Sequence, residues 1–285
     1  MLSIEIRSVV DELIPLLAQL CLSEYGIAVG GAHAKGTDDN ESDLDLYVFT
    51  SNAHKNVERS RLATLFSSDI SDLISWGPDD PFVQGGTDFY YKGHKVECWL
   101  RNRELIDRTI ADCRDGIVTR EFVTWTTTGF YNHCALSDIK VMLPVADPAG
   151  ILARWQGEIA VYPPKLQAAI IRTHLAASRF WPHNSHYTSA VERQDVIYTT
   201  GIVQQVVHNL IQVLFAVNQT YFPGDKKLAS AIDHLARTPE HCVARICRLL
   251  LPEEHLSVAL LRNQQAELQR LLKDVEALAA ERMSI

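Results

Sequence analysis

The sequence has no long run of basic residues. It contains 27 Lys and Arg residues against 35 Asp and Glu residues, so the formal net charge is −8 at pH 7. A protein that holds a long nucleic acid needs a basic face to displace counterions from the phosphates. The charge therefore disfavours long nucleic acid as a partner and favours a small or cationic substrate.

Uninterrupted apolar runs are missing as well. The most apolar stretch, residues 202–217, contains glutamines, an asparagine and a histidine, which a membrane span would not tolerate. The N-terminus carries acidic residues early and has no basic segment followed by an apolar core, so we expect no signal peptide. These features predict a cytoplasmic protein without a membrane partner.

The six cysteines form no pair with two residues between them, and they lie scattered through apolar contexts. This pattern favours buried free thiols in a reducing cytoplasm over a disulfide framework or a zinc site. The chain of 285 residues is 47% hydrophobic and 22% charged, so it has ample material for a core. Its length favours two domains.

The first half of the chain alternates between helix-like and strand-like segments. Apolar residues at helical spacing predict a helix over residues 3–23. Further helices are predicted over residues 56–66, 103–113 and 120–133. Strand-like runs cover residues 27–29, 44–49, 87–91, 94–100 and 139–145. Lys92-Gly93, between two of these runs, predicts a tight hairpin turn. We expect an α/β (α+β) domain with a small mixed sheet over residues 1–147.

The second half shows helical spacing alone. Helices are predicted over residues 166–180, 189–218, 226–236, 239–250 and 253–282. Asp147-Pro148 punctuates the change of pattern. Residues 148–285 are therefore predicted to form an all-α helical bundle domain.

Two aspartates, Asp43 and Asp45, lie at the start of an apolar, strand-like run. Side chains alternate along a strand, so both carboxylates share one face while Leu44 and Leu46 point into the core. Magnesium takes one or two carboxylates together with phosphate oxygens, and such a pair can hold two ions. The alternative is a pair of surface aspartates that caps a loop.

The preceding segment is rich in small residues. Gly30, Gly31 and Gly36, with Ala32 and Ala34 between them, allow the backbone to approach a ligand closely. Loops of this kind present N–H groups to phosphate oxygens. A phosphate-binding loop directly before a metal-binding strand would form a coherent site.

These two motifs resemble the signature of the nucleotidyltransferase superfamily of DNA polymerase β, Gly-Ser-x-Ala-x-Gly followed by Ser-Asp-x-Asp-Leu. The matching stretches are Gly31-Ala32-His33-Ala34-Lys35-Gly36 and Ser42-Asp43-Leu44-Asp45-Leu46. The resemblance implies that the first stretch and Ser42 bind an NTP, and that Asp43 and Asp45 hold two Mg²⁺ ions. One departure is Ala32, which replaces the family serine that contacts the terminal phosphates; the backbone N–H stays and the hydroxyl is lost.

The resemblance also implies a third metal-binding carboxylate on a neighbouring strand. In the run HKVECWLR, Lys95, Glu97 and Trp99 share a face. Glu97 is the predicted ligand. Asp88, on the preceding strand, is the competitor, because a register shift of one residue exchanges the two faces.

The helical half resembles the domain that follows the catalytic domain in lincosamide and aminoglycoside nucleotidyltransferases. In those enzymes a carboxylate of the helical domain often serves as general base for the acceptor hydroxyl. By position, the resemblance implies Asp195 as this base, with Glu192 second. The alternative for Asp195 is a surface acid paired with Arg193 or Arg172.

Lys226 and Lys227 follow the stop Tyr221-Phe222-Pro223-Gly224. The resemblance implies that they contact the triphosphate, while a solvated helix start is the alternative.

Together these features predict a metal-dependent nucleotidyltransferase. It would transfer a nucleoside monophosphate, preferably AMP, from an NTP to a hydroxyl of a small acceptor such as an antibiotic, with a homodimer as one option. The alternatives are transfer to a protein hydroxyl and a nucleotide-binding or interaction protein that has lost turnover. Ala32 favours the last alternative, whereas the set Asp43, Asp45 and Glu97 opposes it.

Overall fold

The computed structural model describes residues 2–39, 42–78, 84–252 and 255–283. The chain forms two compact units, each made of two segments. The first unit comprises Met1–Ala111 and Ala135–Val161, and the second comprises Asp112–Cys134 and Tyr162–Ile285. The domain boundary predicted at residues 147 and 148 stays a prediction, since compactness alone does not define a domain.

A mixed sheet forms the centre of the first unit, as predicted. Within the described residues its six strands are β1 (Tyr25–Val29), β2 (Leu44–Thr50), β3 (Ile70–Trp76), β4 (Gly85–Tyr91), β5 (His94–Asn102) and β8 (Leu143–Ala146). Their order in the sheet is β3-β4-β5-β2-β1-β8. β2 and β5 pair in parallel, and the other neighbouring strands pair antiparallel. The parallel pair lies at the middle of the sheet, and it carries two of the predicted metal-binding carboxylates, Asp45 and Glu97.

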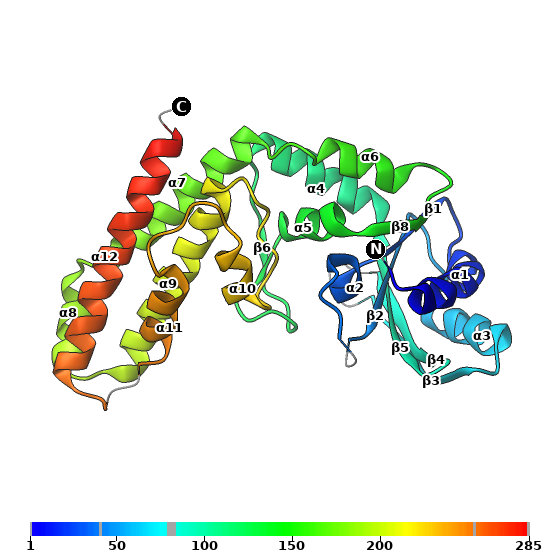
Figure 1. Cartoon of the computed structure of the whole chain (residues 1–285), viewed down its shortest axis with the longest axis horizontal. Coiled ribbons are helices and arrows are strands. Elements are labelled where there is room, and N and C mark those ends of the chain that lie inside the picture. Colours follow the sequence, from blue (N-terminus) through cyan, green and yellow to red (C-terminus); the bar gives the residue numbers. More distant parts are fainter. Residues whose placement is uncertain (1, 40–41, 79–83, 253–254, 284–285) are drawn as a thin grey trace. The chain divides into compact units, whose positions relative to one another are not determined.

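Several helices accompany the sheet. They are α1 (Ile4–Gln19), α2 (Gly31–Lys35), α3 (Asn56–Phe66), α4 (Arg103–Asp115), α5 (Cys134–Val141) and α6 (Ile151–Glu158). In Figure 1, α1 and α3 lie side by side next to the sheet, and α2 lies beside β2. The apolar positions of α1 at helical spacing are buried in one core cluster with the strands.

The core determines the register of β2 and β5. Leu44, Leu46 and Val48 are buried in the cluster beneath α1, together with Val96 and Cys98. Burial of each such side chain contributes roughly 1.5–3 kcal/mol. A shift by one residue would move the whole apolar set to the opposite face, so the core also fixes which face the aspartates occupy.

The opposite face of the sheet is covered near the carboxyl end of β2. The ring of Phe49 lies 5.1 Å from that of Trp155 on α6, edge to face. Asp147, part of the predicted boundary, stabilises the first turn of this helix. Its carboxylate accepts hydrogen bonds from the N–H groups of Ile151 and Ala153, at 2.8 and 3.1 Å. Asp147 and α6 thus belong to the same compact unit.

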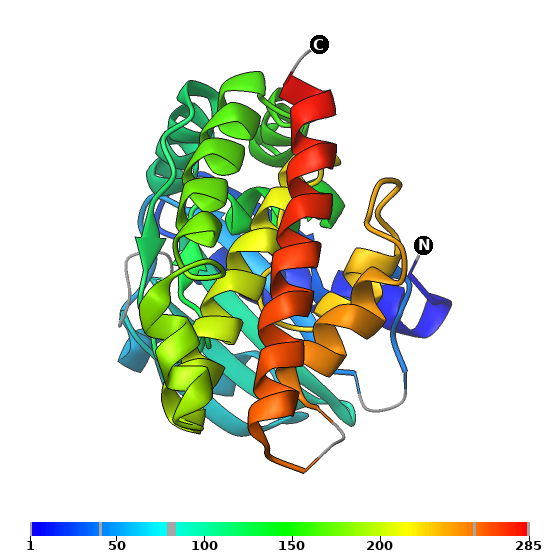
Figure 2. The ribbon, with the colours of Figure 1, turned by 90° about the vertical axis from the view of Figure 1, so that its left-hand side faces the viewer.

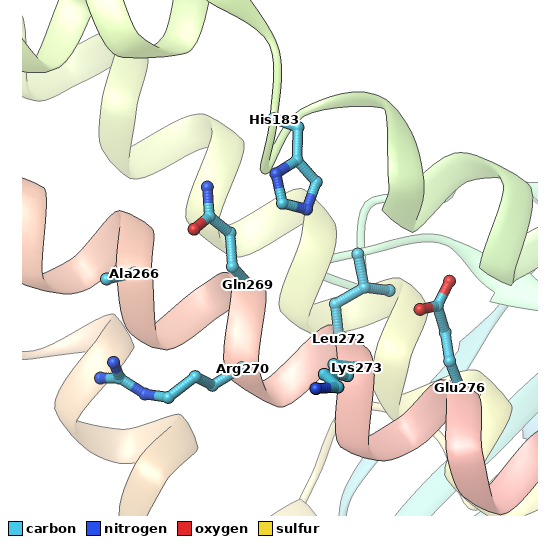
Figure 3. Close-up of a pocket in the computed structure, with 7 residues that line it drawn as sticks. All are labelled: His183, Ala266, Gln269, Arg270, Leu272, Lys273 and Glu276. Atoms are coloured by element: carbon cyan, nitrogen blue, oxygen red, sulfur yellow. The ribbon is translucent and has the colours of Figure 1, made fainter.

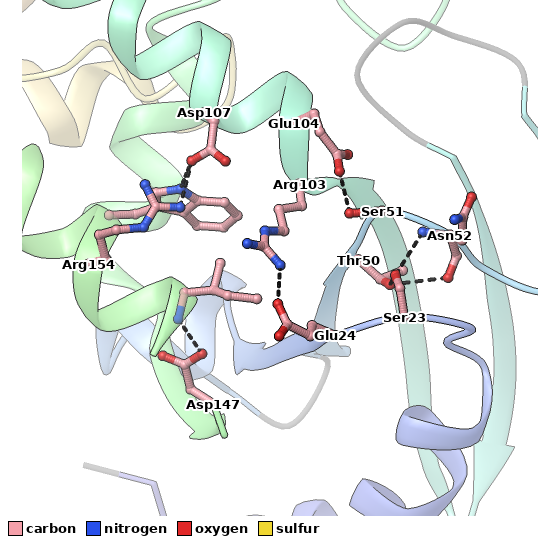
Figure 4. Close-up of polar contacts among 12 residues, drawn as sticks. Ser23, Glu24, Thr50, Ser51, Asn52, Arg103, Glu104, Asp107, Asp147 and Arg154 are labelled. Atoms are coloured by element: carbon pink, nitrogen blue, oxygen red, sulfur yellow. Dashed lines mark hydrogen bonds and ion pairs between the residues drawn. The ribbon is translucent and has the colours of Figure 1, made fainter. Parts of the chain in front are cut away.

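A network of polar side chains surrounds this end of β2 (Figure 4). The hydroxyls of Thr50 and Ser23 lie 2.8 Å apart, and Ser51 donates to Glu104 at the start of α4. Further along α4, Asp107 accepts hydrogen bonds from Arg154 and from the Trp155 indole. These contacts tie β2, α4 and α6 together away from the predicted site.

The described part of the second unit is mainly helical, as predicted. Its helices are α7 (Pro164–Phe180), α8 (Ser185–Glu192), α9 (Val196–Val217), α10 (Leu228–Asp233), α11 (Cys242–Leu250) and α12 (Val258–Met283). The long helices α7, α9 and α12 pack against one another, seen in Figure 2 in green, yellow and red. The predicted helix over 189–218 is broken in the structure, because Gln194 has a φ of 55° and Asp195 begins α9.

α9 is the one helix in the described residues whose length and apolar composition would suffice to cross a membrane. Of its most apolar window, 72% is buried inside the protein. Its apolar faces pack against α7, α8 and α12, as in the central helix of a bundle.

Several predicted elements were wrong. Residues 120–133 form no helix; instead β6 (Arg120–Glu121) and β7 (Phe130–Tyr131) pair antiparallel, joined by a threonine-rich turn in which Gly129 has a φ of 88°. The predicted strand 139–145 is divided between the end of α5 and β8, and β3 was missed. The tight turn at Lys92-Gly93 is confirmed, with φ values of 49° and 84°.

The remaining bundle helices begin or end within a few residues of their predicted limits. The first two residues of the predicted helix 253–282 lie outside the described residues, and α12 begins at Val258.

Candidate active site

The parallel pairing of β2 and β5 brings the predicted carboxylates onto neighbouring strands. Asp45 and Glu97 are register partners, as are Leu44 and Val96. Continuing the register by one residue places Asp43 opposite Lys95. Because side chains alternate along each strand, all four charged groups lie on the face turned away from the α1 core.

Lys95 lies between two of these carboxylates. Its Nζ is 2.6 Å from Oδ2 of Asp43 and 3.0 Å from Oε1 of Glu97. The hydrogen bonds to Asp43 and then to Glu97 raise the pKa of Lys95 above its usual value. The positive charge that a carboxylate cluster requires is therefore supplied here by the chain's own ammonium group.

The carboxylates fit a magnesium ion in part. Asp43 and Glu97 both reach a single cation, the Lys95 ammonium, and one or two carboxylates plus phosphate oxygens satisfy Mg²⁺. Among the residues that the structure describes, however, no three His, Cys, Asp or Glu side chains converge closely enough to hold a metal ion. Metal binding by Asp43, Asp45 and Glu97 stays a prediction.

The glycines before β2 pack directly on Asp45. The N–H of Gly30 donates to the Asp45 carbonyl at 2.9 Å, and a β-carbon at Gly30 would lie 2.3 Å from the ring of Tyr47. Gly31 has a φ of 57°, and a β-carbon there would lie 1.7 Å from Oδ2 of Asp45. Glycine is thus required at both positions by contacts with β2.

The segment predicted as a phosphate-binding loop forms the short helix α2, which begins at Gly31 and ends where Gly36 adopts a φ of 66°. Ala32 is half-buried, and Lys35 and Gly36 are exposed. The N–H groups of a helix's first turn have no acceptor within the helix. In α2 the first turn begins at Gly31, which packs on Asp45. The backbone N–H groups of this turn and the Asp45 carboxylate therefore lie close to each other.

Ser42, two residues before β2, pairs with Asp39. Its hydroxyl donates to Oδ1 of Asp39 at 2.8 Å and accepts the Asp39 N–H at 3.0 Å. The predicted nucleotide contact of Ser42 stays a prediction, since in this structure the hydroxyl pairs with Asp39.

Asp88 shares the face of Glu97 but has other partners. Its carboxylate accepts the Trp76 indole N–H at 2.7 Å and the backbone N–H of Cys98 at 3.2 Å. Burial raises the pKa of Asp88 above its ordinary value, while these two hydrogen bonds lower it. Asp88 therefore braces the sheet, whereas Glu97 lies opposite Asp45 and contacts Lys95.

Arg101 is a further charged residue on this face, and it was not among the predicted site residues. The guanidinium lies 5.2 Å from the centre of the Tyr47 ring and 3.6 Å from the carboxylate of Asp138. Its side chain is only 6% exposed, and its Nε and Nη1 have no hydrogen-bond partner among the described groups. The alternation Glu97, Trp99, Arg101 was the available signal.

In the second unit, Asp195 caps α9. Its carboxylate accepts the N–H of Tyr198 at 3.3 Å. Glu192 forms a two-pronged pair with Arg262, at 2.7 and 2.6 Å. The catalytic role of Asp195 stays a prediction.

Lys226 and Lys227 are exposed and precede α10, which begins at Leu228 rather than at residue 226. The preceding Asp225 accepts hydrogen bonds from the N–H and hydroxyl groups of Thr127 and Thr128. The segment that carries the two lysines is thus anchored within its own unit, and their contact with phosphates stays a prediction.

A shallow pocket of about 380 Å³ lies along α12 and contains none of the predicted site residues. Its lining is His183, Ala266, Gln269, Arg270, Leu272, Lys273 and Glu276 (Figure 3). Glu276 pairs with Arg179 at 2.5 Å and Arg270 with Glu267 at 2.8 Å. Glu276 and Arg270 thus have charged partners within the protein, and their presence in the pocket does not require a bound ligand.

Comparison with known proteins gives a family match and a structural similarity. Residues 141–228 match a family described as a domain of unknown function, DUF4037. A solved structure, a nucleotidyltransferase-like protein from Exiguobacterium sibiricum 255-15, is similar over 95% of this chain and 75% of its own, with 10% identity and a TM-score of 0.47. No curated protein matches the chain. At this identity and TM-score, the similarity does not identify an activity.

Proposed function

We propose that the protein is a metal-dependent nucleotidyltransferase that transfers AMP from ATP to a hydroxyl of a small acceptor. The observation that supports this proposal best is the pairing of Asp45 with Glu97 across β2 and β5. Gly31 packs on Asp45, and the β-carbon of any other residue at this position would clash with the Asp45 carboxylate. Glycine is the residue that lets a backbone approach a neighbouring group or a ligand this closely.

Each group has a defined task in this proposal. Asp43, Asp45 and Glu97 would hold Mg²⁺, which when bound would neutralise phosphate charge and lower the pKa of the acceptor hydroxyl. The first turn of α2 would present its N–H groups to phosphate oxygens. These residues contribute mainly positioning and charge neutralisation, which are the principal requirements of phosphoryl transfer.

The reaction balances without a further reactant. The acceptor oxygen attacks the α-phosphorus, and the bond from that phosphorus to the bridging oxygen breaks. Pyrophosphate leaves with the electron pair, and the hydroxyl proton passes to a general base. Asp195 is the proposed base.

A nucleotide-binding protein without turnover is the second candidate. Two observations favour it: Ala32 has no hydroxyl to offer the phosphates, and Lys95 lies between Asp43 and Glu97. Such a protein would still bind ATP but would release no pyrophosphate.

Two measurements separate these candidates. Thermal shifts with ATP, GTP, CTP and UTP in the presence of Mg²⁺ report binding, and pyrophosphate release with a panel of hydroxyl-bearing small molecules reports transfer. Asp43→Ala and Asp45→Ala should each abolish release. Asp11→Ala is the control, since Asp11 is an exposed aspartate on α1 that pairs with Arg7. Normal turnover in either site variant would contradict the proposal.

A further inference from the structure

We propose that Lys95 is a built-in competitor for the metal: its ammonium occupies the carboxylate site in the free protein, and a divalent ion must displace it. The inference rests on the proposed function, because it concerns the same carboxylates.

The first argument is the position of the ammonium group. A single atom, Nζ of Lys95, lies within hydrogen-bond distance of Asp43 and Glu97, at 2.6 and 3.0 Å. Glu97 lies on β5, and Asp43 directly precedes β2. A cation that joins carboxylates from two strands takes the place that a divalent ion would take.

The second argument is the difference in exposure and side-chain length between the cation and the carboxylates. The Lys95 side chain is 43% exposed. Its ammonium group lies at the end of a flexible four-carbon chain. The Asp43 and Glu97 side chains are only 33% and 29% exposed. Since solvated ion pairs contribute little to stability, Lys95 can move away while the carboxylates keep their places.

The alternative role of Lys95 is purely structural: it would hold the carboxylates in position by balancing their charge. The two roles predict opposite effects of removing the ammonium group. A competitor that is removed leaves a tighter metal site. A structural cation that is removed leaves carboxylates that repel each other, and metal affinity then stays the same or falls.

The experiment measures Mn²⁺ binding, by electron paramagnetic resonance and calorimetry, to the full chain without nucleotide. Lys95→Met loses two solvated ion pairs, with Asp43 and Glu97, and should bind Mn²⁺ roughly five- to tenfold more tightly than the unaltered protein. Lys95→Arg keeps a cation and should stay near the unaltered affinity. Lys92→Met is the matched control, since Lys92 lies in the same hairpin and pairs with Glu12 at 2.6 Å; its Mn²⁺ affinity should not change.

The outcomes are distinguishable. Unchanged or weaker Mn²⁺ binding by Lys95→Met overturns the inference, provided that Asp43→Ala abolishes binding and so locates the metal. Tighter binding supports it even if no acceptor is ever nucleotidylated, in which case the proposed function alone fails. If no variant binds Mn²⁺ in the millimolar range, the inference falls, while pyrophosphate release with ATP still tests the proposed function on its own. A thermal melt of Lys95→Met without metal verifies that it folds.

Discussion

A β-carbon on Gly31 would lie 1.7 Å from Oδ2 of Asp45. The backbone that begins α2 and the carboxylate on β2 are therefore in direct contact, and no side chain can be placed between them. Gly36, at the other end of α2, also has a positive φ but has no atom within 4 Å of such a β-carbon. Substitutions at Gly31 and Gly36 therefore distinguish the effect of backbone strain, which both share, from the effect of a clash with Asp45, which only Gly31 has.

Gly31→Ala should abolish nucleotide transfer. The added methyl forces the Asp45 carboxylate out of place, and the positive φ adds about 1–2 kcal/mol of strain. Gly36→Ala carries the same kind of strain without the collision with Asp45, so it should lower stability by a similar amount and reduce transfer far less than Gly31→Ala does. Urea unfolding and pyrophosphate release on both variants provide the comparison. Equal activity losses would mean that Asp45 is not the affected group.

Glu97→Gln should abolish transfer while ATP binding is largely retained, because Glu97 is expected to hold the metal that activates the acceptor. Asp88→Asn should have a mild effect on transfer. It should instead lower the free energy of unfolding by about 1–3 kcal/mol, because one amide oxygen must then serve both the Trp76 indole and the Cys98 N–H. Opposite results would exchange the roles of Glu97 and Asp88.

Ala32→Ser restores the hydroxyl that the resembled family carries. A neutral hydrogen bond to phosphate contributes roughly 0.5–1.5 kcal/mol, so ATP affinity should rise several-fold at most. Calorimetric titration with ATP and Mg²⁺ measures the change. An affinity that does not move would place the terminal phosphates away from the start of α2.

Asp195→Asn tests the proposed general base without disturbing the helix, since asparagine caps as well as aspartate does. Turnover should fall about 10²- to 10⁴-fold, the melting temperature should be nearly unchanged, and the acidic limb of the pH–rate curve should flatten. Glu192→Gln is the companion variant. It weakens the exposed pair with Arg262, and a loss of turnover there instead would make Glu192 the base.

A buried histidine cluster in the second unit makes its stability depend on pH. His208 Nε2 lies 3.0 Å from the Tyr131 hydroxyl, and His133 Nε2 lies 3.2 Å from the Gln212 side-chain oxygen. Burial is the largest cause in both cases, and it lowers the pKa of His133 to about 3 and that of His208 to about 4. Both side chains are neutral in the folded protein at pH 5.

Stability should therefore fall as the solution is acidified. In the unfolded chain these histidines have pKa values near 6.5 and bind protons below that pH, whereas the folded protein does not bind them until pH 4 or lower. Their contribution is complete above about pH 6.5, and roughly 2 kcal/mol per histidine is lost by pH 5. Urea unfolding at pH 5, 6 and 7 measures this loss. His133→Gln should reduce the pH dependence, and His255→Gln, at an exposed site, should not.

The placement of the aspartates on one face could be predicted from the sequence. Alternation along a strand and the buried positions of Leu44, Leu46 and Val48 are local properties that an apolar pattern states directly. The turn at Lys92-Gly93 and the helical second half are local in the same sense. The helix predicted over residues 120–133 was wrong, because the threonines and Gly129 of this segment form a turn between short strands.

The partners of those aspartates depend on contacts between distant parts of the chain. The pairing of β2 with β5 joins residues that are 52 apart in number, as Lys95 and Asp43 are, and no spacing rule predicts which strands become neighbours. Only that parallel register sets Glu97 beside Asp45 and places the Lys95 ammonium between two carboxylates. The pairing of β3 with β4 brings Trp76 to Asp88. The sequence alone determined which faces the charged side chains occupy, because that depends on alternation; the tertiary structure decided which charges meet, because that depends on the packing of the shared core.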